Sequence, residues 1–165
     1  MDAAFREMLV NRNQAALKDA YLDNSCRHFF TVDWREDDAD VVGYCASCLG
    51  LPSLSADWRD DALVIIFEGK ERPVALVMDV ADRHTTVCAL NDVLSPGFEV
   101  RFIVCSFGSD TLGFAALSVA DWQALEQECP AAVAENFIDP RELPNLMTEL
   151  TAQKLDIIVE RIRRR

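Results

Sequence analysis

The chain has 165 residues, of which half are hydrophobic and 27% are charged, a composition typical of a globular domain with its own core. Acidic residues outnumber basic residues by 28 to 16, which gives a formal net charge of −12. This charge argues against an anionic membrane surface and against direct binding to DNA or RNA, because nucleic-acid binding depends on Lys and Arg side chains that displace counterions.

The first part of the chain is predicted to alternate helices with a strand. Apolar residues recur at helical spacing over residues 4–22, where a polar middle could interrupt the helix. Residues 28–34 are predicted to form a strand, and residues 38–51 a helix capped by Asp37 or Asp38. The inward face of the strand is expected to carry His28, Phe30, Val32 and Trp34.

A hairpin is predicted in the middle of the chain, after a polar loop over residues 52–61. The near-continuous apolar run at residues 63–67 is typical of a central strand covered on both faces. Residues 74–78 are predicted to return antiparallel to it. Helical spacing over residues 83–94 then predicts a helix, with Asp82 as its cap.

A second hairpin is predicted from residues 98–106 and 111–117, joined by a Gly-Ser-Asp turn. Ser118 is a good cap for the helix that follows it, and an amphipathic helix is predicted over residues 145–163. This order favours a single α+β domain over residues 1–165. We expect about five strands in one mainly antiparallel sheet packed with helices.

The six cysteines are expected to be thiols. The N-terminus is acidic where a signal peptide is basic, and no apolar run is long enough to span a membrane, so we expect the reducing cytoplasm. The spacing Cys45-x-x-Cys48 could bind zinc together with Cys26 and His28, or it could cycle as a redox pair. Both thiols lie on one apolar face of a predicted helix, however, which favours core packing. No metal or cofactor is therefore expected.

No catalytic motif is present in the sequence, which lacks dinucleotide, phosphate-loop, serine-hydrolase and zinc-protease signatures. Ser109 stands beside an acid, but it lies among residues typical of a tight turn. An enzyme is therefore not expected. The alternative is a small hydrolase or metal enzyme that would use Cys45, Cys48 and His84.

Acidic residues concentrate in two similar segments, at residues 33–40 and 57–62, which could be neighbours in the fold. Each segment sets a tryptophan among carboxylates, which suits an interface with a basic protein because the ring can anchor and the charges can steer. The opposing interpretation is that both tryptophans are core residues and the acids are solvated caps. The residues predicted to contact a partner are Asp33, Trp34, Glu36, Asp37, Asp38, Asp57, Trp58, Asp60 and Asp61.

The chain resembles bacterial toxin-immunity proteins in its size, acidity and α+β order; these proteins neutralise a toxin, often a basic nuclease, by binding it. Residues 82–85, 90–94, 98–101 and 108–111 are also similar to segments of bacterial α+β proteins of this size that have no assigned activity, so no site residue carries over. A further resemblance is to type III secretion chaperones, which are small, acidic and dimeric. The resemblances imply a non-enzymatic cytoplasmic binding protein, monomeric or homodimeric, that neutralises a basic toxin; a secretion chaperone is the alternative.

Overall fold

The computed structural model describes every residue except 2, 24 and 165. Its α-helices are α1 (Ala3–Val10), α2 (Gln14–Leu22), α3 (Asp38–Leu49), α4 (Asp82–Leu94), α5 (Val119–Glu128), α6 (Pro130–Asn136) and α7 (Ala152–Arg163). Its strands are β1 (Phe29–Asp33), β2 (Leu54–Arg59), β3 (Ala62–Phe67), β4 (Lys70–Val74), β5 (Phe98–Ile103), β6 (Thr111–Ser118) and β7 (Phe137–Ile138). Two short 3₁₀ helices, Val104–Ser106 and Pro140–Glu142, complete the described regular structure.

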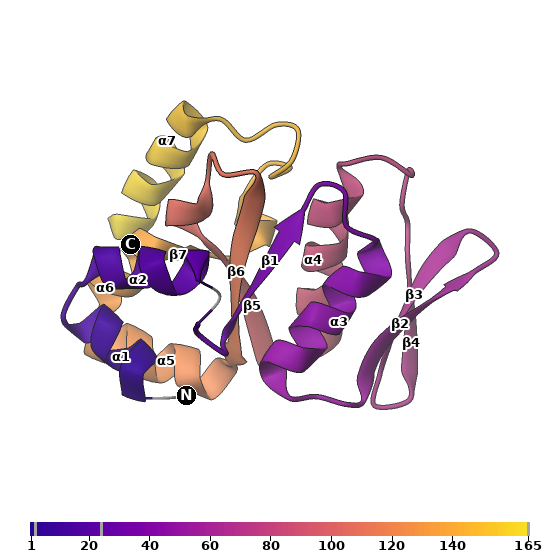
Figure 1. Cartoon of the computed structure of the whole chain (residues 1–165), viewed down its shortest axis with the longest axis horizontal. Coiled ribbons are helices and arrows are strands. Elements are labelled where there is room, and N and C mark those ends of the chain that lie inside the picture. Colours follow the sequence, from indigo (N-terminus) through magenta and orange to yellow (C-terminus); the bar gives the residue numbers. More distant parts are fainter. Residues whose placement is uncertain (2, 24, 165) are drawn as a thin grey trace.

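The strands form two antiparallel sheets, one of four strands in the order β1-β6-β5-β7 and one of three in the order β2-β3-β4. Helices α3 and α4 lie between the two sheets, and α1, α2, α5 and α6 lie on the other side of the four-stranded sheet (Figure 1). The buried residues of α7 belong to the same apolar cluster as those of α3 and α4. The α+β class and the second predicted hairpin are confirmed, and β3 does pair antiparallel with the segment after it, but the strand that returns is residues 70–74 and not the predicted 74–78. The prediction of about five strands in one sheet is wrong, because β2 and β7 are additional and the strands divide between two sheets.

Strand β2 replaces most of the polar loop predicted over residues 52–61. Its residues alternate between a core-facing side, which carries Leu54, Ala56 and Trp58, and an outward side of polar residues. An antiparallel strand with one exposed face has this alternating pattern. The polar residues of its exposed face are of the types that also occur in loops, which is why the sequence predicted a loop here. A turn at residues 60–61 joins β2 to β3, which contains the apolar run at residues 63–67.

Two apolar clusters form the core, one on each face of the four-stranded sheet. Phe30 and Val32 of β1 belong to the cluster that surrounds α3 and α4, and Phe29 belongs to the cluster beneath α1, α2, α5 and α6. Successive side chains of a strand point to opposite faces, so β1 contributes to both clusters. Trp34 follows the end of β1 and is 51% exposed, so its prediction as an inward residue is wrong.

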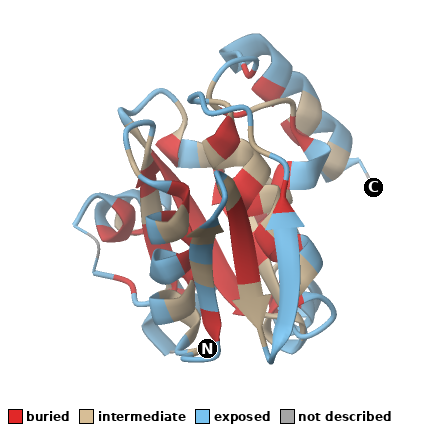
Figure 2. Cartoon of the chain, turned by 90° about the vertical axis from the view of Figure 1, so that its right-hand side faces the viewer, coloured by how far each residue is buried: buried red, intermediate tan, exposed pale blue. Residues whose placement is uncertain are grey.

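Strand β3 is the central strand of its sheet, as predicted, but helices cover it on one face only. Leu63 and Ile65 are fully buried on the face toward α3 and α4, whereas Ile66 on the opposite face is half-buried. Figure 2 shows this sheet from its outer side, with the largely exposed β4 at its edge. The outer face is covered only in part, since Val64 is buried there and Ile66 is not, so the prediction that both faces are fully covered is too strong.

Element boundaries also differ from prediction elsewhere; the strand predicted over residues 98–106, for example, ends at Ile103. A turn at residues 11–13 divides the predicted first helix into α1 and α2, where the polar residues had indicated a break. The returning strand was predicted over residues 74–78 but occupies residues 70–74, and residues 75–81 form a loop. The last helix begins at Ala152 rather than near residue 145, since the Thr151 hydroxyl caps it by accepting from the Lys154 N–H. Within the described part of the chain, no helix is long and apolar enough to cross a bilayer.

Candidate partner-binding site

A surface hollow of about 380 Å³ lies where the end of β1, the start of α3, the core-facing side of β2 and the loop before α4 meet. We call it the tryptophan hollow. Its lining residues are Trp34, Arg35, Glu36, Asp37, Asp38, Trp58, Met78, Asp79, Val80 and Arg83. Both predicted tryptophans and several of the predicted acids therefore line one concave surface.

A hydrogen bond joins the two acidic segments. Asp37 caps α3 by accepting from the Ala39 N–H at 2.8 Å, and the same carboxylate oxygen accepts from Trp58 Nε1 at 3.0 Å. The segments are thus neighbours, as their sequences allowed. They meet at the start of α3 and not through strand pairing, because β1 and β2 belong to different sheets.

Asp38 is a structural residue and does not present its carboxylate to a partner. Its side chain is 1% exposed and accepts hydrogen bonds from the Arg83 guanidinium, at 2.9 Å for one pair of atoms, and from the Thr86 hydroxyl at 2.6 Å. Burial raises the pKa of the Asp38 carboxyl, and these hydrogen bonds oppose the rise. Arg83 also donates to the Glu36 carbonyl, so one ion pair fixes the base of the tryptophan hollow. The prediction of Asp38 as a contact residue is corrected accordingly.

The loop over residues 75–81 carries exposed apolar side chains beside the tryptophan hollow. Val77 is 72% exposed and Met78 is 68% exposed. The buried Asp82 carboxylate accepts from the backbone N–H groups of Val77, Met78 and Asp79, at 3.0, 2.6 and 3.1 Å. Met78 has a φ of +63°, which a residue with a side chain adopts only where its surroundings impose it. The loop is therefore held in one shape with its apolar side chains in solvent.

Sequence reasoning missed this loop because it placed residues 74–78 in a strand. The available signal was Asp79-x-x-Asp82, two side chains of the type that bond nearby backbone N–H groups before a helix. Asp79 accepts from the Ala81 N–H at 2.6 Å in this way. Asp82 is the first residue of α4 and supports the loop, so its prediction as the helix cap is wrong.

The remaining predicted residues lie around the tryptophan hollow rather than in it. Asp33 is paired with Arg35, whose guanidinium also lies 5.4 Å from the centre of the Trp34 ring. Asp57 lies on the outward side of β2, 3.6 Å from Arg59. Asp60 and Asp61 are exposed and form the β2–β3 turn with positive φ angles. Asp57, Asp60 and Asp61 therefore place negative charge on the hairpin that carries Trp58, outside the lining of the hollow.

The Asp33–Arg35 pair gives a testable titration. Hydrogen bonds from the guanidinium and the backbone N–H of Arg35 lower the pKa of Asp33 to about 2, from a usual 3.8. We expect Arg35→Ala to raise this pKa toward 3.8 without reaching it, because the backbone bond remains. Since the folded-state pKa is the lower one, the pair stabilises the fold above about pH 3.8 and loses this effect as the pH falls through about 2.

Carbon-detected NMR of the Asp33 carboxyl measures this titration directly. Arg59→Ala is the matched control, because it removes another exposed arginine that is ion-paired elsewhere. We expect the control to leave the Asp33 titration unchanged. Identical Asp33 titrations in wild type and Arg35→Ala would contradict the assigned cause.

The cysteines do not form the site that an enzyme or a zinc protein would need. Cys45 is fully buried and Cys48 packs against the same core cluster, as the core-packing interpretation predicted. Burial raises the pKa of both thiols, that of Cys48 to about 12, and a protonated thiol is a poor nucleophile. His84 lies 3.5 Å from the Cys88 thiol on α4. No three His, Cys, Asp or Glu side chains of the described residues lie close enough together to hold a metal ion.

The chain matches no family model, no curated protein and no solved structure. The resemblances to immunity proteins and to secretion chaperones therefore remain predictions.

Proposed function

We propose that the chain is a non-enzymatic, immunity-type protein that binds a basic toxin through the tryptophan hollow and the loop over residues 75–81. The observation that carries this proposal is the set of exposed apolar side chains, Trp34, Val77 and Met78, in an acidic surround, with the backbone of Val77 and Met78 held by Asp82. Exposed apolar groups that are fixed in place and bordered by polar residues are typical of protein interfaces.

The apolar side chains would supply most of the affinity. Burying a Val or Met side chain stabilises a complex by about 1.5–3 kcal/mol, and a tryptophan that enters an interface contributes at least as much. Trp58 forms one wall of the hollow and is fixed by its bond to Asp37. A partner residue that enters the hollow would therefore meet preformed walls.

The acids would supply speed and selectivity. Asp37 and Asp79 are exposed in the lining of the tryptophan hollow, and Asp57, Asp60 and Asp61 are exposed on the hairpin that carries Trp58, on a chain with a net charge of −12. Such a field accelerates the approach of a basic partner and opposes that of an acidic one. The effect weakens with salt, because exposed charges are screened over about 10 Å at 0.1 M.

The opposing interpretation explains only part of this surface. Asp37 is a helix cap and Asp38 belongs to a buried ion pair, as that interpretation expects. It does not explain Trp34 and Met78, which are 51% and 68% exposed and pack into neither core cluster. The proposed interface therefore depends mainly on the exposed apolar side chains and less on the acids.

Affinity capture with three immobilised proteins tests the proposal. The wild type is compared with a Trp34→Ala/Met78→Ala variant and with a Leu22→Ala/Ile157→Ala control. The control removes apolar side chains of similar exposure from α2 and α7, neither of which lines the tryptophan hollow. We expect mass spectrometry to identify a basic protein that the wild type and the control retain and the hollow variant loses. That protein should be toxic when expressed alone and harmless when expressed with the wild type; failure of either result would overturn the proposal.

Charge variants then predict the kinetics with the purified partner. We expect Asp57→Asn/Asp60→Asn/Asp61→Asn to slow association by about tenfold at low salt, and by less as salt rises. Asparagine tolerates the positive φ angles of Asp60 and Asp61, so the turn should persist.

The control for this experiment is Asp19→Asn/Asp23→Asn/Asp156→Asn, which removes the same charge from exposed sites on and next to α2 and α7. Surface plasmon resonance over a range of salt concentrations compares the variants. Equal association rates for the two triple variants would show that the acids beside the hollow do not steer the partner.

A further inference from the structure

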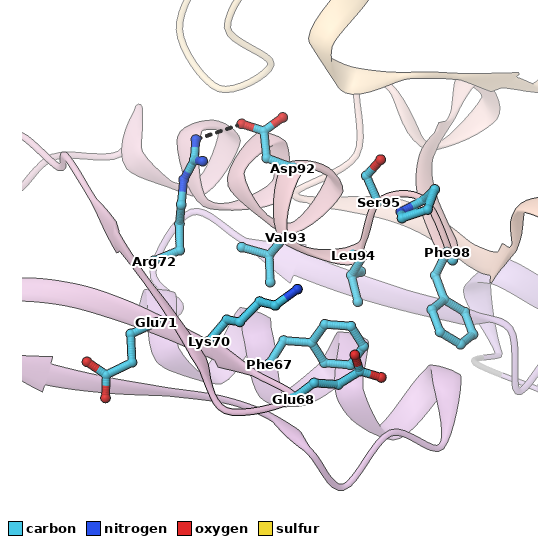
Figure 3. A pocket seen from close by; sticks show the side chains of 12 residues that line it. Phe67, Glu68, Lys70, Glu71, Arg72, Asp92, Val93, Leu94, Ser95 and Phe98 are labelled. Carbon is cyan, nitrogen blue, oxygen red and sulfur yellow. Dashed lines mark hydrogen bonds and ion pairs between the residues drawn. The ribbon is translucent and has the colours of Figure 1, made fainter.

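A second hollow, of about 500 Å³, lies between the β3–β4 turn and the C-terminal end of α4. We call it the lysine hollow; its apolar wall is formed by Phe67, Val93, Leu94 and Phe98, and Lys70 and Glu68 carry its unpaired charges (Figure 3). It shares no lining residue with the tryptophan hollow. Its size is within the roughly 300–1,000 Å³ of small-molecule sites, which also combine apolar walls with a few polar groups.

The strand register directs Lys70 into this space. Phe67 pairs with Lys70 across β3 and β4, and side chains at paired positions share one face of a sheet. Phe67 follows the buried Leu63 and Ile65 at alternate positions, so that face is the one toward α4. Figure 3 shows the Lys70 side chain extending beneath Val93 toward Leu94.

Of the cationic side chains that line the lysine hollow, Lys70 is the one that remains free to bind an anionic group of a ligand. Its neighbour Arg72 is held by Asp92 at 3.1 Å, and Glu71 points away and pairs with Arg59 at 2.8 Å. Among the described residues, the side chains of Lys70 and Glu68 have no hydrogen-bond or ion-pair partner. Figure 3 places the Lys70 ammonium and the Glu68 carboxylate at separate points around the Phe67 ring.

We propose that the lysine hollow binds a free amino acid with a large apolar side chain. Lys70 would pair with the ligand carboxylate, Glu68 with its ammonium group, and the apolar wall with its side chain. A zwitterion fits better than a simple carboxylate for an electrostatic reason. The net charge of −12 repels a ligand with net negative charge but not one that is neutral overall.

Titration of the wild type with L-phenylalanine, followed by amide NMR, tests the proposal without any protein partner. We expect saturable shifts at Lys70, Val93 and Phe98, and none in the tryptophan hollow. Lys70→Met keeps the length of the side chain and should weaken binding by about tenfold, as expected for the loss of one charge-assisted bond. Lys18→Met is the matched control, because Lys18 is an exposed lysine on α2 that lines neither hollow, and it should bind like the wild type.

Ligand analogues test each part of the assignment. 3-Phenylpropionate lacks the ammonium group, phenethylamine lacks the carboxylate, and L-alanine lacks the apolar body; each should bind more weakly than L-phenylalanine. Glu68→Gln should remove the preference for L-phenylalanine over 3-phenylpropionate. The proposal is overturned if L-phenylalanine causes no saturable shift up to its solubility limit, if Lys70→Met binds like the wild type, or if 3-phenylpropionate binds as tightly as L-phenylalanine.

Discussion

Ile65→Asp should prevent folding, whereas Ile66→Asp, at the next position of β3, should leave a folded protein. Ile65 is fully buried between the sheet and the helices, where a carboxylate would have no partner. Burying an unpaired charge costs at least several kcal/mol, comparable to the roughly 5–15 kcal/mol by which a domain is stable. Ile66 points to the outer face of the sheet, where water reaches part of its side chain.

Circular dichroism and thermal melting of the two variants check this expectation. Each variant is the other's control, because the substitution and the strand are the same and only the face differs. We expect no cooperative transition for Ile65→Asp and a cooperative transition at reduced temperature for Ile66→Asp. Cooperative melting of both variants at similar temperatures would show that the face of β3 toward α4 is not the buried one.

Asp38→Ala should lower the free energy of unfolding by about 3–5 kcal/mol, which is the usual cost of removing one partner from a buried ion pair. The Arg83 guanidinium, whose side chain is 14% exposed, would keep its charge and lose both carboxylate oxygens. Thr86, fully buried, would lose the acceptor for its hydroxyl. Urea unfolding measures this loss.

Two further variants complete the test of the ion pair. Asp40→Ala changes an exposed acid in the same turn of α3 and should alter the free energy of unfolding by less than about 0.5 kcal/mol. Asp38→Ala/Arg83→Met removes the unpaired charge and should recover part of the stability lost by Asp38→Ala. An Asp38→Ala variant as stable as Asp40→Ala would contradict the role assigned to the pair.

Elements with local signals could be predicted from the sequence. Asp37 and Gly50 mark the two ends of α3, and Ser118 marks the start of α5; each acts within a few residues of its own position. The division into two sheets could not be predicted, because pairing depends on contacts between distant segments. The start of α7 was misplaced because Leu146 and Leu150 have helical spacing but are buried outside a helix.

The sequence allowed the main residues of the candidate site to be predicted, but not the contacts between them. The sequence identified two tryptophans among carboxylates, and the structure places both in one hollow. It could not show that Asp38 is neutralised by Arg83, which lies 45 positions away. The sequence also did not indicate the apolar loop, because Val77 and Met78 continue a run of strand-forming residues. The loop forms because the Asp82 side chain accepts hydrogen bonds from the backbone N–H groups of these two residues.

The hydrogen bonds to Asp82 also affect the entropy of association. Ordering the backbone of one residue costs about 1–2 kcal/mol of conformational entropy at 25 °C. If the loop over residues 75–81 became ordered only in a complex, that cost would be subtracted from the affinity for each residue fixed. Asp82 orders the loop as the chain folds, so Val77 and Met78 are already positioned when a partner binds. Little of the free energy gained by burying them is then offset by the entropy cost of ordering the loop.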